Sequence, residues 1–349
     1  MSAPLLSVKD LRVGFGTEDG VVQAVDGVNF DLRPGEVVAI VGESGSGKSV
    51  TAQTIIGLTR ANNARIEGSV KLGGEELTSA GDAEMRKLRG ERVAMIFQDP
   101  MTSFNPVYRL GDQIVEAIRA HRPDTSKKQG RQRVVELFEA VGIPDAERRV
   151  DDYPHEFSGG MRQRAMIAMA LALEPEVLIA DEPTTALDVT IQAQILGLIE
   201  DLNREHNLAT ILITHDLGVV AEVADRVLVM YAGKVVEEGT LDEIFYDPQH
   251  PYTWGLLGSL TRLDRPRPRR LPQIAGSPPS LLDLPEGCPF RPRCPHEFSK
   301  CPEYPGLEAR LPDSSDHRDR CWLTPEEKRE KRMVEGQIGL EAPRSVGQA

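Results

Sequence analysis

The chain has 349 residues, of which 40% are hydrophobic and 27% charged; this is typical of a globular protein longer than one domain, so we expect one large and one smaller domain. The formal net charge of −13 argues against a nucleic-acid partner, because proteins that bind phosphate backbones usually present a basic surface. No uncharged apolar run approaches the ~20 residues of a membrane span, and no secretory signal pattern is visible, so we expect the chain to stay in the cytoplasm.

The N-terminal residues predict antiparallel strands. Residues 5–13 alternate between apolar and polar side chains, and a second apolar-rich run covers residues 21–32, with glycines between the two runs. We expect Phe15 in the turn between them. There it is a candidate for stacking on an adenine ring, and a place in the core is the alternative.

Residues 37–49 predict a phosphate-binding loop. A β-branched apolar run passes directly into the pattern Gly-x-x-x-x-Gly-Lys-Ser, and helix-compatible sequence follows. The glycines can point successive backbone N–H groups inward, and the start of a helix adds unpaired donors. Lys48 is expected to reach the β- and γ-phosphates and the Ser49 hydroxyl to ligate Mg²⁺, whereas the alternative is a plain turn with an exposed lysine. The expected nucleotide-contacting residues of the loop are Gly42, Ser44, Gly45, Gly47, Lys48 and Ser49.

Two further strands are expected over residues 66–72 and 92–97. Gln98 follows the second strand and precedes Asp99-Pro100, where the proline ends the strand. A polar side chain at this edge is a candidate to contact Mg²⁺ or an attacking water. The loop over residues 101–108 is apolar yet irregular, which favours a surface that contacts a partner.

Residues 110–173 predict a group of helices inserted into an α/β frame. Within this region Ser158-Gly159-Gly160 opens a helix. With Ser158 as N-cap and free backbone N–H groups on the two glycines, this turn is a second predicted anion-binding helix start.

A short apolar strand over residues 177–180 leads into Asp181-Glu182. Two acidic residues at the end of a strand beside a phosphate loop predict two different roles, one in binding the metal ion and one in activating water. Asp181 would hold Mg²⁺, directly or through water, and Glu182 would orient and deprotonate the attacking water. Two solvated acids in a turn are the alternative.

Asp188 is expected to cap the next helix, and a second buried strand over residues 210–214 ends at His215. At this strand end His215 is expected to hydrogen-bond the γ-phosphate, although a lone histidine is more often structural. Residues 226–239 predict a hairpin that closes the sheet.

With these elements in this order, the chain resembles the nucleotide-binding subunit of an ABC transporter. The match covers about residues 5–250, and one departure is Met161, where the commonest signature has Gln. The matching motifs are the Walker A loop at residues 42–49, the Q-loop at Gln98, the signature at residues 158–160, Walker B at residues 177–182, the D-loop at residues 186–188 and the switch histidine at His215.

The resemblance implies an α/β fold built on an ABC-type P-loop nucleotide-binding domain, with a RecA-like core, an antiparallel β subdomain and a helical subdomain. We expect this domain over residues 1–250, with the helical subdomain at about 105–173. A small Pro- and Cys-rich C-terminal extension would follow over residues 251–325, and a charged tail over residues 326–349.

The resemblance also implies ATP and Mg²⁺ as cofactors and a site that one chain cannot complete. In the family, two such subunits close head to tail, so that the Ser158-Gly159-Gly160 turn of one subunit covers the γ-phosphate bound by the other. The implied catalytic residues are Glu182, His215 and Gln98, the implied Mg²⁺ contacts are Ser49, Gln98 and Asp181, and Phe15 and Asp188 join the nucleotide-binding set.

The C-terminal segment resembles the extension of oligopeptide and dipeptide importer ATPases. More than half of the 25 prolines lie between residues 248 and 312, so we expect this segment to be extended and not helical. The resemblance implies a peripheral subunit at the cytoplasmic face of the membrane. Its implied partners are a second, paralogous ATPase, two permease subunits and a peptide-binding protein.

The four cysteines all lie in this segment, as Cys288, Cys294, Cys301 and Cys321. Their spacing is C-x5-C-x6-C-x19-C, and three of them precede proline. In a reducing compartment four such thiols predict metal ligation rather than disulfides. A [4Fe–4S] cluster is the first expectation, and structural zinc or free thiols are the alternatives.

The sequence therefore predicts an ATPase that powers peptide import. One alternative is a soluble ABC ATPase acting on DNA or ribosomes, but the chain has neither a long coiled-coil insertion nor a second cassette. An exporter ATPase would ordinarily lack this C-terminal extension. An importer for nickel or glutathione is the closest alternative in cargo.

Overall fold

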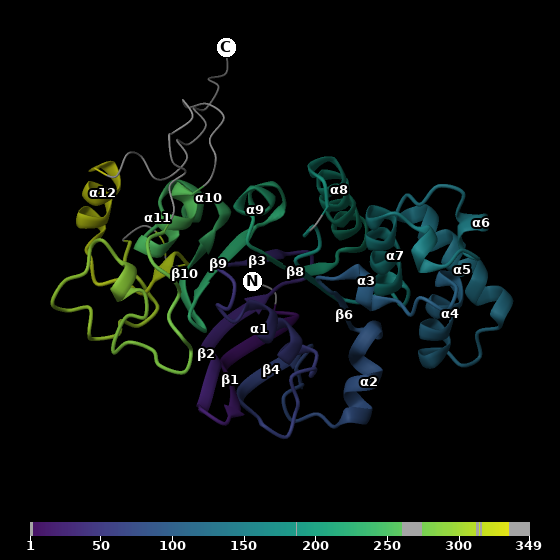
Figure 1. Cartoon of the computed structure of the whole chain (residues 1–349), viewed down its shortest axis with the longest axis horizontal. Helices are drawn as coiled ribbons and strands as arrows, with labels where there is room; N and C mark the ends of the chain where they lie inside the picture. The colour runs from purple at the N-terminus through teal and green to yellow at the C-terminus, as the bar shows by residue number, and fades with distance from the viewer. Residues whose placement is uncertain (1–2, 186, 260–273, 312–313, 315, 335–349) are drawn as a thin grey trace, which may run out of the picture.

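The computed structural model describes residues 3–185, 187–259, 274–311, 314 and 316–334. Two β-sheets form the centre of the molecule, with a block of helices on one side and the C-terminal segment on the other (Figure 1). Ala186 of the expected D-loop and residues 335–349 of the expected tail lie outside the described residues. None of the described helices is both long and apolar enough to span a membrane.

The smaller sheet is antiparallel and confirms the N-terminal strands expected from the sequence. Its order is β2-β1-β4-β5. Phe15 lies within β1 rather than in a turn, paired with Val22, because the hairpin turn is formed by residues 18 and 19. The strands are β1 (Leu6–Thr17), β2 (Gly20–Leu32), β4 (Ala64–Leu72) and β5 (Glu75–Glu76).

The larger sheet has eight strands in the order β11-β12-β10-β9-β3-β8-β7-β6. Its five strands from β9 to β6 are mutually parallel, and β10 closes the predicted hairpin against β9. The strands are β3 (Val37–Val41), β6 (Val93–Ile96), β7 (Val177–Asp181), β8 (Ala209–Thr214), β9 (Arg226–Tyr231), β10 (Lys234–Thr240), β11 (Glu308–Ala309) and β12 (Arg318–Asp319).

The parallel strands are buried on both faces, which explains their continuous apolar sequence. Along β7, Leu178 and Ala180 face a core shared with the helical block, whereas Val177 and Ile179 face the core shared with the antiparallel sheet. Because parallel strands run in one direction, their carboxyl ends meet at one edge of the sheet. Val41 pairs there with Thr214, and Asp181 pairs with Ile213.

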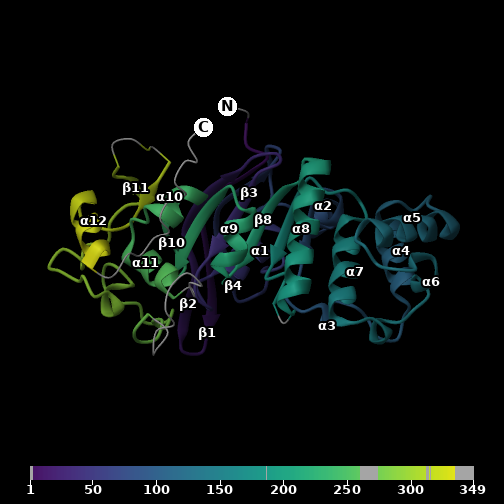
Figure 2. The same cartoon turned by 90° about the horizontal axis from the view of Figure 1, so that it is seen from above.

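The helical region expected at about 105–173 forms a block that Figure 2 shows at one end of the molecule. Its core includes an edge-on contact between Phe138 and Phe157, whose ring centroids are 6.1 Å apart. The described helices are α1 (Lys48–Ile55), α2 (Asp82–Glu91), α3 (Pro100–Ser103), α4 (Leu110–His121), α5 (Lys127–Ala140), α6 (Ala146–Arg149), α7 (Gly159–Leu171), α8 (Val189–His206), α9 (Leu217–Val223), α10 (Leu241–Tyr246), α11 (Pro251–Gly258) and α12 (Pro325–Val334), with 3-10 turns at Pro154–Glu156 and Arg291–Arg293.

The expectation that residues 248–312 are not helical is wrong for α11. Pro251 occupies the first turn of this helix, where its missing N–H costs no hydrogen bond. The side chain of His250 caps the helix by accepting the N–H of Tyr252. The helix is strongly buried, with Tyr252 and Trp254 at 0% and 1% exposure.

The C-terminal segment is joined to the main sheet by strand pairing and buried ion pairs. Strand β12 extends the sheet by pairing with β10, which places Asp319 opposite Glu237. His317 Nε2 lies 2.8 Å from Glu237 Oε1, and Lys328 Nζ lies 2.7 Å from Asp319 Oδ1. All four side chains are at most 1% exposed, so each charge depends on its partner.

We predict that Glu237→Gln destabilises the C-terminal segment by about 3 kcal/mol, because it leaves a buried His317 without its counter-charge. The measurement is urea unfolding followed by tryptophan fluorescence, since both tryptophans, Trp254 and Trp322, lie in this part of the chain. Glu67→Gln is the control: it breaks the exposed pair with Arg65 and should cost less than about 1 kcal/mol. Equal shifts for the two variants would contradict the role of the buried pair.

Candidate functional site

The predicted phosphate loop connects β3 to α1 with the geometry that its sequence implies. Gly47 is the N-cap of α1 in the left-handed region, with φ of 101°. At Gly42, which has φ of 151°, an added Cβ would lie 2.2 Å from the carbonyl oxygen of Met230, so a side chain cannot be accommodated. The loop therefore requires glycine at both positions for physical reasons.

Lys48 is buried under the loop, at 5% exposure. Its ammonium donates to the carbonyl oxygens of Gly42 at 2.7 Å and Glu43 at 2.9 Å. Burial lowers the pKa of Lys48, and the nearby carboxylates of Glu182, Asp181 and Glu43 oppose that shift. The lysine is thus a cation surrounded by oxygen acceptors at the end of β3.

Ser49 and Asp181 meet across the sheet edge. The hydroxyl of Ser49 donates to Asp181 Oδ1 at 2.9 Å, and Asp181 is 3% exposed. Burial raises the pKa of Asp181, opposed by this hydrogen bond. A serine hydroxyl beside a carboxylate offers the oxygen ligands that Mg²⁺ takes in nucleotide sites, where phosphates and water complete the coordination. The residues present therefore fit the expected ion.

Glu182 is held in a sparsely populated backbone conformation, with φ of 49°. Its N–H donates to the carbonyl oxygen of Ile213 at 2.8 Å, which ties this conformation to strand β8. Such strain is characteristic of functional positions that the surrounding structure holds in place.

Three polar side chains surround the Glu182 carboxylate. The amide of Gln98 donates to Oε2 at 2.9 Å, and the hydroxyl of Thr185 donates to the same oxygen at 2.8 Å. His215 Nδ1 lies 3.3 Å from Oε1. Burial raises the pKa of Glu182, but the Thr185 hydrogen bond and the proximity of His215 outweigh it, so the net pKa is lowered and the group is an anion.

The Ser158-Gly159-Gly160 turn begins α7 as the sequence indicates. Ser158 is the N-cap, and its hydroxyl accepts the N–H of Met161 at 3.3 Å. Asp188 caps α8 in the same way, accepting the N–H of Ile191 at 3.0 Å. A Cβ on Gly160 would lie 2.8 Å from Ile191 Cγ2, so the turn packs closely on α8.

The turn lies away from the phosphate loop of its own chain. In Figure 2, α8 stands between α7, which the turn begins, and α1, which follows the phosphate loop. The structure thus brings Lys48, Ser49, Asp181, Glu182 and the three side chains that contact Glu182 together at one sheet edge. The turn at residues 158–160 begins a different helix, α7. Phe15 is half-buried in β1 against the core of the antiparallel sheet.

Sequence reasoning missed three residues of this region. Thr185 follows Glu182 by three residues, a spacing that could have indicated its contact. Tyr252 accepts the backbone N–H of Glu43 at 2.8 Å, and Arg293 pairs with the Glu43 carboxylate at 2.6 Å. These two lie more than 200 residues from the loop in sequence, and no local signal points to them.

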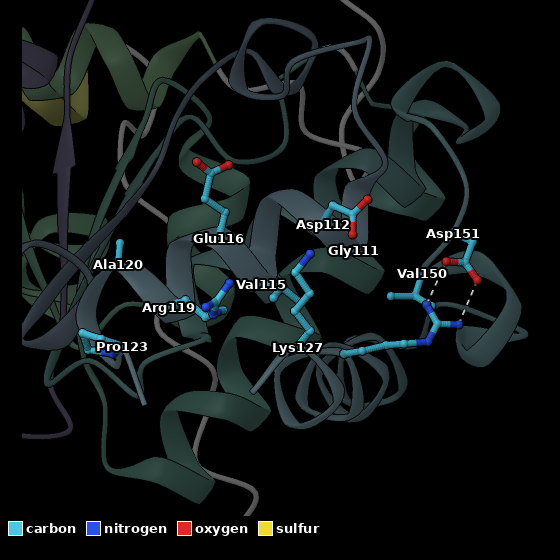
Figure 3. A pocket seen from close by; sticks show the side chains of 11 residues that line it. Gly111, Asp112, Val115, Glu116, Arg119, Ala120, Pro123, Lys127, Val150 and Asp151 are labelled. Carbon is cyan, nitrogen blue, oxygen red and sulfur yellow. Dashed lines mark hydrogen bonds and ion pairs between the residues drawn. The ribbon is translucent and has the colours of Figure 1, made fainter. Parts of the chain in front are cut away.

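A large hollow in the helical block is distinct from this site. It measures about 980 Å³ and lies against α4, α5 and the residues after α6 (Figure 3). Asp151 forms a bidentate ion pair there with Arg131, at 2.8 Å for both contacts. Neither the phosphate loop nor the acidic pair contributes to its lining, so this hollow is not the nucleotide site.

The four cysteines line one small pocket in the C-terminal segment. The backbone N–H of Phe298 donates to the sulfur of Cys301 at 3.4 Å. Cys288, Cys294 and Cys321 each accept from the N–H two residues further on. Burial raises the pKa of Cys288 to about 11 and those of Cys294 and Cys321 to about 12. Among the described residues, no three His, Cys, Asp or Glu side chains are already arranged to hold a metal ion.

Comparison with known proteins gives two family matches. Residues 25–185 match the ABC transporter family, and residues 236–301 match the C-terminal region of oligopeptide and dipeptide transporters. The first range contains the phosphate loop and the acidic pair, and the second contains three of the four cysteines.

Curated relatives extend over most of the chain. It is 55% identical over 321 residues to the dipeptide transport ATP-binding protein DppD of Bacillus subtilis (strain 168), covering 91% of this chain and 94% of that protein. It is 54% identical over 308 residues to the oligopeptide transport ATP-binding protein OppD of Escherichia coli (strain K12), covering 88% and 90%.

Solved structures share the fold of the nucleotide-binding region. The dimeric post-hydrolysis state of the ATP-binding cassette MJ0796, bound to ADP and Pi, aligns with a TM-score of 0.61 at 28% identity, covering 68% of this chain and 98% of that one. CbiO1 from Clostridium perfringens aligns with a TM-score of 0.58 at 29% identity, covering 70% and 91%. Together with the motif order, these matches confirm the fold and the family expected from the sequence. The chain belongs to the ABC transporter family, as an ATP-hydrolysing subunit that carries the C-terminal region of the oligopeptide and dipeptide transporters.

Proposed function

We propose that this chain powers the import of peptides across the cytoplasmic membrane by binding and hydrolysing ATP. The observation that carries the proposal is the position of Glu182. Its carboxylate lies among Gln98, Thr185 and His215, at the strand edge where the phosphate loop and Asp181 also lie. The printed names of its relatives, dipeptide and oligopeptide transport ATP-binding proteins, support peptides as the cargo.

The proposed mechanism assigns each step to a side chain at this edge. The loop glycines and the start of α1 hold the phosphates, and Lys48 moves from the carbonyls of Gly42 and Glu43 to the β- and γ-oxygens. Ser49 and Asp181 would hold Mg²⁺, which supplies charge neutralisation to the phosphates when bound.

Glu182 then accepts a proton from the attacking water. Its lowered pKa keeps it ionised, and its contacts with Thr185 and Gln98 orient the carboxylate. His215 lies beside the other carboxylate oxygen, and its proposed role is to hydrogen-bond the γ-phosphate. The loop, Asp188 and Phe15 make up the rest of the proposed nucleotide contacts.

Completion of the site requires a second ATPase subunit in this proposal. The turn at residues 158–160 presents backbone N–H groups at the start of α7, and Figure 2 shows α8 between α7 and α1, the helix that follows the chain's own phosphate loop. Val189, next to Asp188, is 82% exposed, which favours an interface at the start of α8. The solved structure of the MJ0796 cassette is dimeric, which supports a second ATPase subunit. The partner is proposed to be a paralogue.

We propose that two permease subunits bind the ATPase pair and respond to its closing and opening. A peptide-binding protein is the further proposed component of the complex. The loop after Gln98 exposes Val107 and Tyr108 at 70% and 59%, and Phe97 before it at 40%. These exposed apolar side chains lie beside Gln98, which contacts Glu182. They suit a docking surface through which closure of the two ATPase subunits reaches the permease. We place the chain at the cytoplasmic face of the membrane as a peripheral subunit.

Peptide import is tested with the complete complex in proteoliposomes. We expect ATP-dependent uptake of a labelled dipeptide or oligopeptide, and more than tenfold weaker ATP binding in Lys48→Ala, because that change removes the cation of the cradle. Uptake of nickel or glutathione in place of peptide would show that the transported substrate is not a peptide of the kind proposed. Purification with nucleic acid and without membrane subunits would overturn the transporter proposal in favour of a soluble ATPase.

We predict that Glu182→Gln lowers the ATP hydrolysis rate by about 10²-fold or more while leaving ATP binding within about threefold, because it removes the base and keeps the cradle. Phosphate release and equilibrium ATP binding measure the two effects separately. Glu176→Gln, which alters an exposed pair with Arg92 at the far end of β7, is the control. Normal turnover of Glu182→Gln would remove this residue from the role of base.

We propose further that the four cysteines bind a [4Fe–4S] cluster, with structural zinc as the alternative. Four thiols around one pocket, each beside a backbone N–H donor, fit an iron–sulfur donor set. Binding would draw the sulfurs together and release their protons, because burial keeps Cys288, Cys294 and Cys321 protonated at neutral pH.

Anaerobic purification tests this cofactor. We expect a brown protein that contains iron and sulfide, and loss of both in a Cys294→Ser variant whose tryptophan fluorescence stays native-like. A colourless protein with stoichiometric zinc would replace the cluster by zinc. Four reactive free thiols with neither metal would exclude both.

A further inference from the structure

One ion pair joins the cysteine-bearing segment directly to the phosphate loop. Arg293 Nη1 lies 2.6 Å from Glu43 Oε2, and Arg293 Nη2 lies 3.0 Å from Glu43 Oε1. Glu43 is the second residue of the loop, and Arg293 lies in the 3-10 turn between Cys288 and Cys294. The Arg293 side chain is 5% exposed, so this bidentate contact is shielded from solvent on the arginine side.

The guanidinium of Arg293 is also held by contacts other than the one with Glu43. It donates to the carbonyl oxygen of Ala275 at 2.9 Å and to the hydroxyl of Tyr231 at 3.3 Å. It also lies 5.9 Å from the ring centroid of Phe290. With its other donors used in this way, the arginine cannot leave Glu43 without breaking several contacts.

The backbone of Glu43 is held from the same side. Its N–H donates to the hydroxyl of Tyr252 at 2.8 Å. The ring of Tyr252 packs against Tyr231 and Phe290, with centroids 4.6 Å and 5.3 Å away. Residues after position 230 therefore hold both the main chain and the side chain of this loop residue.

Glu43 adds a negative charge to a loop whose proposed role is to bind anions. Its carbonyl oxygen accepts from Lys48 at 2.9 Å, and its carboxylate is one of the acids that act on the Lys48 ammonium. A carboxylate without a partner here would attract Lys48 and repel the phosphates of a nucleotide. Arg293 supplies the opposite charge.

We infer that Arg293 is a positioning residue for nucleotide binding: it neutralises Glu43 and holds the phosphate loop, so that affinity for ATP depends on a residue of the C-terminal segment. The inference rests on the proposed role of the loop in binding nucleotide. It predicts opposite effects at the two ends of the pair, because removing the arginine exposes a negative charge and removing the carboxylate exposes a positive one.

The test measures binding of ATP to the full chain and its variants by equilibrium titration. Arg293→Met should weaken ATP binding about tenfold, Glu43→Gln should leave it unchanged or tighten it, and the double variant should return to within about threefold of the native protein. The loss in Arg293→Met should shrink with added salt and should be larger for ATP than for ADP, because it is electrostatic.

The matched control is Arg291→Met, which removes a guanidinium from the same turn. Arg291 pairs with Glu297 at 3.3 Å within the C-terminal segment, so its loss should change ATP affinity less than twofold. Native-like tryptophan fluorescence verifies that each variant is folded, and Glu43→Gln tests the inference even where Arg293→Met does not fold.

Two results would overturn the inference. One is native ATP affinity in Arg293→Met. The other is a loss of ATP affinity in Glu43→Gln as large as that in Arg293→Met, because the pair would then affect binding only through the shape of the loop. If residues 42–49 did not bind the nucleotide, Lys48→Ala would bind ATP with native affinity, which distinguishes that result from the two above.

Discussion

The parallel pairing of β3, β7 and β8 is the constraint on which the candidate site depends. Three segments that are far apart in sequence end in one row, because Val41 pairs with Thr214 and Asp181 with Ile213. The residues that follow these strand ends therefore emerge side by side. The N–H of Glu182 donates across this edge to the carbonyl oxygen of Ile213. This hydrogen bond holds the backbone of Glu182 in the left-handed conformation from which its carboxylate extends. A shift of one strand by one residue would separate the phosphate cradle from the acidic pair.

The site at this sheet edge lacks the helix start at residues 158–160, which we propose a second subunit supplies. The helix start at Ser158 is capped internally, but the N–H groups of Gly159 and Gly160 belong to the orphan donors of a helix terminus. In Figure 2, α8 lies between α7, which begins at this turn, and α1, which follows the chain's own phosphate loop. In the function proposed above, a nucleotide held between two such surfaces would link its hydrolysis to subunit separation and, through the permease subunits, to transport.

The C-terminal segment is part of the nucleotide-binding architecture rather than an appended module. Strand β12 adds to the main sheet, and buried ion pairs at Glu237 and Asp319 fix that junction. Buried pairs gain little net stability but are costly to break, so they favour one register of attachment. Through Tyr252 and Arg293 the segment contacts the second residue of the phosphate loop. The cysteines and the nucleotide loop thus belong to one continuous network of contacts.

Sequence alone determined the features that depend on short-range geometry. The phosphate loop, the caps at Ser158 and Asp188, and the apolar strands that end at Asp181 and His215 follow from local backbone requirements and from hydrophobic periodicity. The tertiary structure decided what depends on distant packing: the burial of α11, the pairing of β12 with β10 and the contact of Arg293 with Glu43. These cannot be inferred from spacing, because an ion pair across 250 residues exists only where the fold brings its partners together.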